Sequence, residues 1–155
     1  MEERRHGGRA LIDRGADVNA KDSTVQSAYL IATSEGYLDL LRLTLANGAE
    51  VNDKDSWNGP GLIRAAERGH HLVVGELLRT AIAKDHVNRI GYHALHEAVW
   101  LRRSSAACVD TVRVLVAGGV RLNRPSATEP LTPLEMARSR GYDRLGAVLV
   151  DATEA

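Results

Sequence analysis

The sequence predicts an all-α solenoid, in which about four helix-turn-helix units stack behind an N-terminal partial unit and β-turns project from one edge. Motifs recur in the same order at a spacing of 33 residues, as between Asn19 and Asn52. Within each unit, apolar residues follow the spacing of an α-helix. The 155-residue chain has no Phe, two Trp and four Tyr. Its interior must therefore be packed with small and aliphatic side chains, which favours closely stacked helices.

The N-terminal stretch reads as the end of a unit. In "GGRALIDRGADVN" (residues 7–19), Gly15 follows Leu11 and Ile12 as a glycine follows the last turn of a helix. The stretch matches residues 40–52 in the 33-residue register. We therefore expect residues 1–21 to form a partial repeat that begins inside an outer helix. It serves either as a minimal cap or as the remainder of a longer repeat.

Two regular units follow, at about residues 22–54 and 55–87. In each, an apolar helical pattern ends at a glycine turn, Gly36-Tyr37 or Gly69-His70, and a second apolar run follows. The polar runs "NAKDST" and "NDKDSW" suit projecting turns. Alanines at positions 32, 65 and 98 keep the same interval, which places them at equivalent points of successive inner helices.

The third unit, residues 88–125, is longer than the others. Five residues are inserted near 102–107, in "VWLRRSSAACV", where the glycine turn is missing. We expect the inner helix to run longer, a loop at about 103–107, and Ser104 or Ser105 to cap the next helix. Residues 126–155 form a C-terminal cap, and the whole chain, 1–155, is predicted to be a single domain.

These motifs resemble the ankyrin repeat. The family's unit of turn, helix, Gly-His turn and helix is matched by "GADVNAKD", "GAEVNDKD", "AAERGHHLVVGELL", "ALHEAV" and "LTPLEMARSRGY". The resemblance covers about residues 8–150 and is strongest to small bacterial ankyrin-repeat proteins. The family's Thr-Pro-Leu-His motif is kept as Thr132-Pro133-Leu134 but reads His93-Ala94-Leu95-His96 in the third unit. Helix capping is therefore expected to be uneven.

The turn position that usually holds Gly in this family is occupied by four different residues. They are Val25, Asn58, Gly91 and Pro130. Gly and Asn tolerate a positive φ, whereas Val and Pro do not. We therefore expect the first and last turns to differ in shape from the other two.

The resemblance implies a non-enzymatic module that binds a protein through the concave face formed by turn tips and inner helices. By the family pattern, this face includes Ile31, Ser34, Glu35, Met136, Ser139 and Arg140. The candidate partner contacts are Trp57, Tyr92, Trp100, Arg64, Glu67, Arg68, Arg89, Glu97 and Leu101.

The candidate contacts centre on three aromatic residues. Trp, Tyr and Arg dominate interface hot spots, so a partner-binding patch around Trp57, Tyr92 and Trp100 is one interpretation. In the other, Trp57 folds over its own turn and Trp100 packs beneath the insertion, because large aromatic side chains are often mostly buried.

Composition narrows the range of partners and locations. Twenty basic and twenty acidic residues give a net charge of zero, which disfavours nucleic acid and anionic membranes as partners. No apolar stretch is long enough to span a bilayer. Cys108 is the single cysteine, which agrees with a reducing compartment. We expect a cytoplasmic monomer that needs no cofactor and binds a protein of unspecified identity.

Two further functional classes remain as alternatives. His93 and His96 lie three residues apart on one helix and could share a metal, and Cys108 near a helix start could be an activated nucleophile. Together they would make a metal-dependent or thiol enzyme. The family pattern gives His96 a hydrogen-bonding role instead, and Cys108 also suits a buried apolar position. A third possibility is a regulatory protein, such as an inhibitor or immunity partner of an adjacent enzyme.

Overall fold

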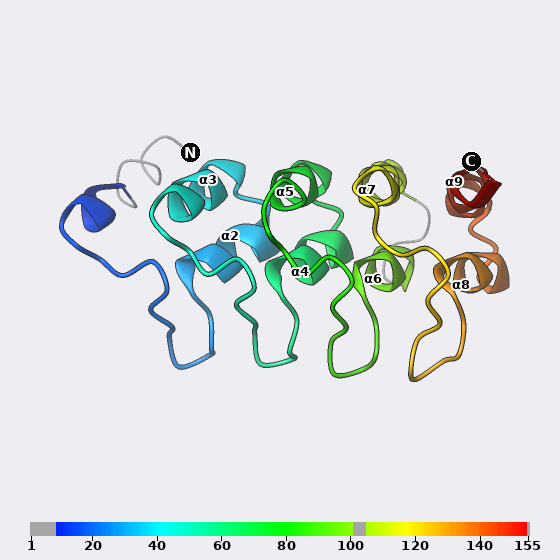
Figure 1. The fold of residues 1–155 in the computed structure, drawn as a ribbon, viewed down its shortest axis with the longest axis horizontal. Helices are drawn as coiled ribbons and strands as arrows, with labels where there is room; N and C mark the ends of the chain where they lie inside the picture. The colour runs from blue at the N-terminus through cyan, green and yellow to red at the C-terminus, as the bar shows by residue number, and fades with distance from the viewer. Residues whose placement is uncertain (1–8, 101–104, 155) are drawn as a thin grey trace.

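The computed structural model describes residues 9–100 and 105–154 and has the predicted all-α solenoid architecture. Inner helices form one layer, outer helices form a second, and the loops that precede the inner helices extend to one side (Figure 1). The inner helices are α2 (Ala28–Glu35), α4 (Gly61–Glu67), α6 (Ala94–Trp100) and α8 (Pro133–Ser139). The outer helices are α3 (Leu38–Ala46), α5 (His71–Leu77), α7 (Ala106–Ala117) and α9 (Asp143–Glu154).

The chain enters the solenoid through an outer-layer segment. Residues 9–13 are helical, and Gly15 follows with a φ of +86°, so glycine ends this helix as its sequence predicts. The part of the expected N-terminal unit that falls on residues 1–8 lies outside the described residues. Within the described ranges, no helix is long and apolar enough to cross a membrane.

Small side chains allow the inner helices to approach closely. Ala32, Ala65 and Ala98 are fully or almost fully buried, at 0%, 0% and 1% exposure. A Cβ atom added to Gly61 would lie 2.7 Å from Thr33 Cγ2 on the preceding inner helix. The expectation that small and aliphatic residues pack the interior is confirmed, and the 33-residue spacing of the alanines corresponds to equivalent inner-helix positions.

Asparagine side chains link successive units at two junctions. Asn52 Nδ2 donates to Ala81 O at 3.2 Å, and its Oδ1 accepts from Ala83 N at 2.7 Å. Asn19 makes the same two contacts one repeat earlier, with Gly48 O at 3.0 Å and Glu50 N at 2.8 Å. The recurring "GADVN" and "GAEVN" motifs thus supply both a turn and a connection between repeats.

The projecting turns are organised by their first side chain. Asp22 Oδ1 accepts from Thr24 N at 2.8 Å and from Gln26 N at 3.0 Å. Asp55 Oδ1 accepts from Trp57 N and Gly59 N, both at 2.9 Å. These hydrogen bonds fix the backbone of each turn.

The expectation that the first turn differs in shape is wrong. Val25 has a φ of 62°, close to the 60° of Asn58 and in the same region as Gly91 at 83°. The hydrogen bonds to Asp22 hold Val25 in a conformation that its own side chain disfavours. The fourth turn does differ: Ser126 N donates to Leu131 O, five residues on, whereas Asp22 N donates to Gln26 O, four residues on.

Capping is uneven, as predicted. Ser27 caps α2, and Thr132 forms a capping box with Glu135 at α8, whereas Pro60, the residue before α4, provides no side-chain cap. Ser105 caps α7 by accepting from Cys108 N at 3.3 Å. Because α7 begins at Ala106, the predicted loop at 103–107 ends earlier than expected. The described part of inner helix α6 reaches Trp100, and the expectation that this helix runs longer falls on residues 101–104, which lie outside the described ranges.

Candidate partner-binding surface

Trp57 lies at the tip of the second projecting turn and is 59% exposed. Its backbone N–H donates to Asp55 Oδ1 at 2.9 Å, and its carbonyl accepts from Arg89 N of the next turn at 3.0 Å. The backbone that carries the indole is therefore held on both sides. With this exposure, Trp57 presents much of its ring to solvent instead of covering its own turn.

Further exposed residues extend this surface along the solenoid. Arg89 and Ile90 form the tip of the third turn, and Ile90 is 41% exposed. On the first inner helix, Ile31 is 38% exposed. Apolar and basic side chains are thus available to a partner on neighbouring repeats.

Tyr92 is buried, which corrects the expectation that it is an exposed contact. It is 2% exposed, stacks on His96 at 5.4 Å between ring centroids, and meets the Trp100 ring edge-on at 5.4 Å. Burial raises the pKa of its hydroxyl. Trp100 remains half-buried, with the Arg140 guanidinium 3.7 Å from its ring centroid. Tyr92 therefore supports Trp100 from beneath.

Two other residues expected on this face are also buried. Met136 has 0% exposure, and Ser34 has 7% exposure with its hydroxyl hydrogen-bonded to Ile31 O. Met136 is the fourth residue of α8, as Ile31 is of α2, so equivalent positions in different repeats differ in burial. Leu101, the last candidate contact, lies outside the described residues.

Polar contacts join the turns to the inner helices at equivalent positions. Arg64 Nε lies 3.1 Å from Asp55 Oδ2, and Arg64 Nη1 lies 2.8 Å from Glu67 Oε2. One repeat later, Asn88 Nδ2 donates to Glu97 Oε1 at 2.7 Å. Sequence reasoning did not identify Asp55 and Asn88 as parts of the surface. The shared spacing of the two pairs, Asp55 to Arg64 and Asn88 to Glu97, is the signal that could have found them.

The carboxyl group of Glu97 has a raised pKa. Its side chain is buried, with 5% residue exposure, and burial raises its pKa from 4.5 to about 7. The hydrogen bond from Asn88 lowers the pKa and the charge of Glu67 raises it, but both effects are smaller. Glu97 was also expected to contact a partner, and its burial corrects that expectation.

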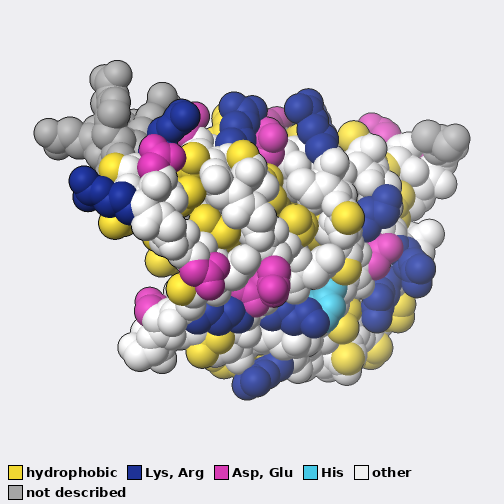
Figure 2. Space-filling view, turned by 60° about the vertical axis from the view of Figure 1, so that its left-hand side comes forward, with side chains coloured by type: hydrophobic (Ala, Val, Ile, Leu, Met, Phe, Trp, Pro, Cys, Tyr) yellow, Lys and Arg dark blue, Asp and Glu magenta, His cyan; other side chains and the backbone are white. Residues whose placement is uncertain are grey.

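Charges of both signs alternate over the visible face of the molecule (Figure 2). Arg68 Nη1 lies 2.7 Å from Glu35 Oε1, an ion pair between successive inner helices. Both side chains are substantially exposed, so the pair contributes little to stability and can exchange partners. A partner would therefore meet paired charges of both signs on this part of the surface.

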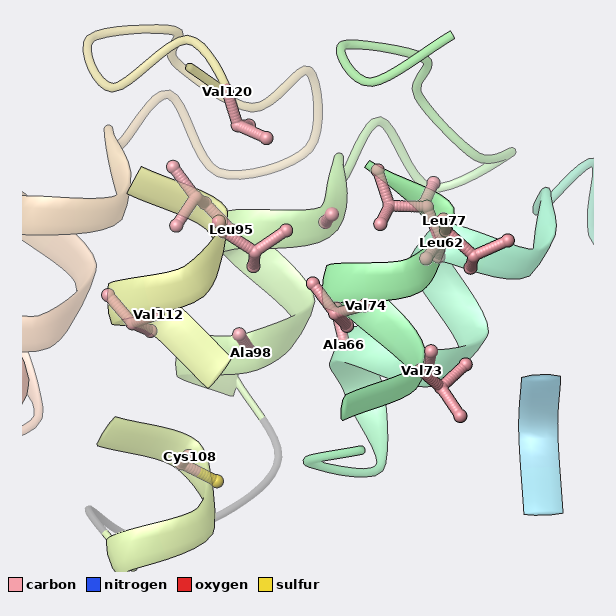
Figure 3. Close-up of a cluster of buried hydrophobic side chains, with 14 of the residues drawn as sticks. Leu62, Ala66, Val73, Val74, Leu77, Leu95, Ala98, Cys108, Val112 and Val120 are labelled. Carbon is pink, nitrogen blue, oxygen red and sulfur yellow. The ribbon is translucent and has the colours of Figure 1, made fainter. Parts of the chain in front are cut away.

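The residues of the alternative metal or thiol site are buried in the interior. His93 and His96 have 0% exposure, and their Nε2 atoms lie 3.0 Å from Arg121 O and 3.1 Å from Leu131 O. Among the residues that the structure describes, no group of three or more His, Cys, Asp or Glu could hold a metal ion. Cys108 also has 0% exposure and lies in the hydrophobic core (Figure 3).

Comparison with known proteins finds similarity to ankyrin-repeat proteins along most of the chain. The family model for ankyrin repeats in three copies matches residues 29–126. The chain is 36% identical over 146 residues to the putative ankyrin repeat protein YahD of Escherichia coli strain K12, covering 92% of this chain and 71% of that protein.

Solved structures agree with the sequence relatives. An ankyrin repeat domain from Acinetobacter baumannii AYE has a TM-score of 0.90 at 39% identity, covering 96% of this chain and 76% of that one. The ankyrin repeat protein EF0377 has a TM-score of 0.87 at 33% identity, covering 94% and 76%. Ankyrin repeats generally act as protein-protein interaction modules. By its repeats, its helix pairs and its relatives, this chain belongs to the ankyrin-repeat family.

Proposed function

We propose that this protein binds another protein through a surface made of turn tips and inner helices, and that it catalyses no reaction. The proposed contacts are Trp57, Arg89 and Ile90 on the turns, with Arg64, Glu67, Arg68 and Trp100 on the inner helices. Tyr92 and Glu97 support this surface from beneath. The exposed indole of Trp57 is the observation that carries the proposal.

Burial of the Trp57 indole against a partner would contribute much binding free energy at a small cost in conformational entropy. An aromatic side chain buries on the order of 200 Å² when it is fully enclosed. Covering the 59% that is exposed would stabilise a complex by roughly 3 kcal/mol, at about 25 cal/mol per Å². The turn is already fixed by Asp55 and Arg89, so little backbone freedom is lost on binding.

The burial of the chemically reactive side chains supports a non-catalytic role. Cys108 is enclosed by core residues, and the imidazoles of His93 and His96 are bonded to backbone carbonyls. A nucleophile or base must reach its substrate within hydrogen-bond distance. These three side chains are instead used in packing and in contacts between repeats.

A capture experiment with matched variants tests the proposal. A partner is isolated from the native cell by affinity purification and identified by mass spectrometry, and its Kd is then measured with both proteins purified. We expect Trp57→Ala to weaken binding about 30- to 150-fold, which corresponds to roughly 2–3 kcal/mol. Trp100→Ala should weaken it less, because Trp100 is half-buried.

The control is Leu72→Ala, which removes a large apolar side chain from the outer helix α5. Leu72 is 63% exposed, similar to Trp57. We expect it to leave the Kd unchanged, with helical circular dichroism preserved in all three variants. Equal losses from Trp57→Ala and Leu72→Ala, or no loss from Trp57→Ala in a folded protein, would refute the proposed surface.

A further inference from the structure

His93, the residue before α6, and His96 within α6 form a buried pair whose close contacts need more hydrogen-bond donors than two neutral rings supply. His93 Nδ1 and His96 Nδ1 lie 3.1 Å apart, within hydrogen-bond distance. On the far side of each ring, Nε2 faces a backbone carbonyl: Arg121 O at 3.0 Å for His93 and Leu131 O at 3.1 Å for His96. The four ring nitrogens thus make three close contacts: one between the two rings and one from each ring to a carbonyl. A carbonyl oxygen can only accept, so each of those two Nε2 atoms must donate.

Counting protons shows that two neutral imidazoles cannot fill all three contacts. A neutral imidazole carries one N–H, so the pair has two donors. If both donors face the carbonyls, two lone pairs point at each other across 3.1 Å. If one donor is moved between the rings, a lone pair faces a carbonyl instead. One added proton supplies the missing donor, because a protonated imidazole donates through both nitrogens.

The direction of the shared hydrogen bond follows from a fourth contact. The backbone N–H of His96 approaches His93 Nδ1 at 3.4 Å. This nitrogen is therefore placed as an acceptor, and the added proton belongs on His96 Nδ1, from which it donates to His93 Nδ1. We propose that the His93–His96 pair is a binding site for one proton, shared between the two Nδ1 atoms, that makes the junction between α6 and the fourth repeat sensitive to pH.

The surroundings place this proton uptake in the acidic range. Burial lowers the pKa of both imidazoles, that of His96 from 6.5 to about 4, and the charge of His93 lowers the pKa of His96 further. Nearby, Asp85 raises the pKa of His93, whereas Arg124 lowers the pKa of both rings. The aromatic face of Tyr92 lies against His96 at 5.4 Å. We expect the shared proton to enter between about pH 4 and 6.5.

The position of the pair gives this proton a structural consequence. Arg121 follows α7, and Leu131 lies in the turn before α8, so the two carbonyls tie α6 to the segments that lead into the last helix pair. In the unfolded chain both rings bind a proton once the pH falls below about 6.5, whereas the folded pair has a place for one proton. Stability is therefore fully present above about pH 6.5 and falls as the pH is lowered towards 4, but more slowly than if the folded pair bound none.

Imidazole NMR tests the proposal on the intact chain. The protein is labelled with ¹⁵N-histidine, and the two ring nitrogens of His93 and His96 are followed from pH 7.5 down to about 3, one unit below the pKa of His96, with circular dichroism at each pH. We expect both Nδ1 signals to shift together in a single step of one proton, while both Nε2 atoms remain protonated. Two independent steps, or the absence of any Nδ1 shift while the chain is folded, would overturn the proposal. Loss of folded structure in the same step would also overturn it.

Two variants sharpen the test. His93→Thr places the family's usual residue beside His96, where the hydroxyl can donate to Nδ1 and removes the need for an added proton. We expect the His96 signals to stay constant over the same pH range in this variant. His71→Gln, which removes a half-buried imidazole from α5, should leave the shared step unchanged. An unaltered His96 step in folded His93→Thr contradicts the shared site.

Discussion

The carboxyl group of Glu97 lies beneath the proposed surface, where it accepts a hydrogen bond from the amide of Asn88 at 2.7 Å. Burial raises its pKa to about 7, so the group is largely protonated below that pH and charged above it. Ionisation of this buried carboxyl reduces stability, because its desolvation outweighs the hydrogen bond from Asn88 and the charge of Arg64. Groups whose pKa is shifted in this way often lie at functional sites, which agrees with the position of Glu97 near Glu67 and Arg64 of the proposed surface.

We predict that Glu97→Gln stabilises the protein at alkaline pH. The folded pKa of about 7 lies above the unfolded value of 4.5, so the stability that the protonated form provides is present below 4.5 and is lost as the pH rises through 7. Glutamine keeps the shape and cannot ionise. The free energy of unfolding should rise by up to about 3 kcal/mol at pH 8 and change little near pH 4.5, as measured by urea denaturation.

Glu35→Gln is the control for this prediction. Glu35 lies in the same layer, but its side chain is 45% exposed and forms an exposed ion pair with Arg68. We expect its substitution to change the free energy of unfolding by less than about 1 kcal/mol at either pH. If Glu97→Gln is no more stable than the wild type at pH 8, the carboxyl is not buried in the way described.

Sequence patterns predicted individual residues well where the local chain decides their place. Ser105 caps its helix as expected, and Trp57 occupies an exposed turn tip. Tyr92 and Met136 were assigned to the surface by the family pattern, but both are buried, Tyr92 against the rings of His96 and Trp100. Val25 has a positive φ because Asp22 fixes its turn, which a residue's own propensity does not reveal.

At the scale of elements, the connection between repeats depends on a few side-chain bridges. Asn52 bridges the loop after α3 to the loop after α5 with two hydrogen bonds, and Asn19 does the same one repeat earlier. In a stack where each unit contacts its neighbours, such bridges couple units that would otherwise open separately. The repeated motif identified these asparagines in the sequence, but the backbone groups that they bond in the next repeat are known only from the structure.

We predict that Asn52→Ala lowers the free energy of unfolding by about 1–2 kcal/mol, because two hydrogen bonds of roughly 1 kcal/mol each are lost. Urea denaturation at neutral pH measures the change. Asn47→Ala is the control, since Asn47 makes a hydrogen bond within its own helix, to Leu43 O at 2.8 Å. We expect a smaller loss there. An Asn52→Ala protein as stable as the Asn47→Ala protein would show that the bridge does not couple the repeats.

At the scale of the whole molecule, the 33-residue period was sufficient to predict the architecture. Each unit packs against its neighbours in the same way. The alanines of the inner helices and the glycine turns are therefore enough to predict the stack, even though distant contacts are not known from the sequence. The extra residues of the third unit and the longer fourth turn interrupt this register. In the third unit the predicted end of the loop was wrong, because α7 begins at Ala106.

Both layers of the solenoid expose apolar side chains. The exposure of apolar side chains alone therefore does not decide which layer a partner covers. Leu72 on an outer helix is as exposed as Trp57 on a turn. The turns differ from the outer helices in presenting Trp57, Arg89 and Ile90 on neighbouring tips, next to the paired charges of the inner helices. This grouping of an aromatic, an apolar and a basic side chain is typical of interface hot spots.

Hydrogen-deuterium exchange on the free protein and on its complex with the captured partner distinguishes the two layers directly. If the partner binds the turns and inner helices, the amides of residues 55–59 and 88–92 should exchange more slowly in the complex, while α5 and α9 keep the rates of the free protein. Slower exchange confined to the outer helices α3, α5, α7 and α9, with unchanged rates in these turns, would contradict binding through the proposed surface.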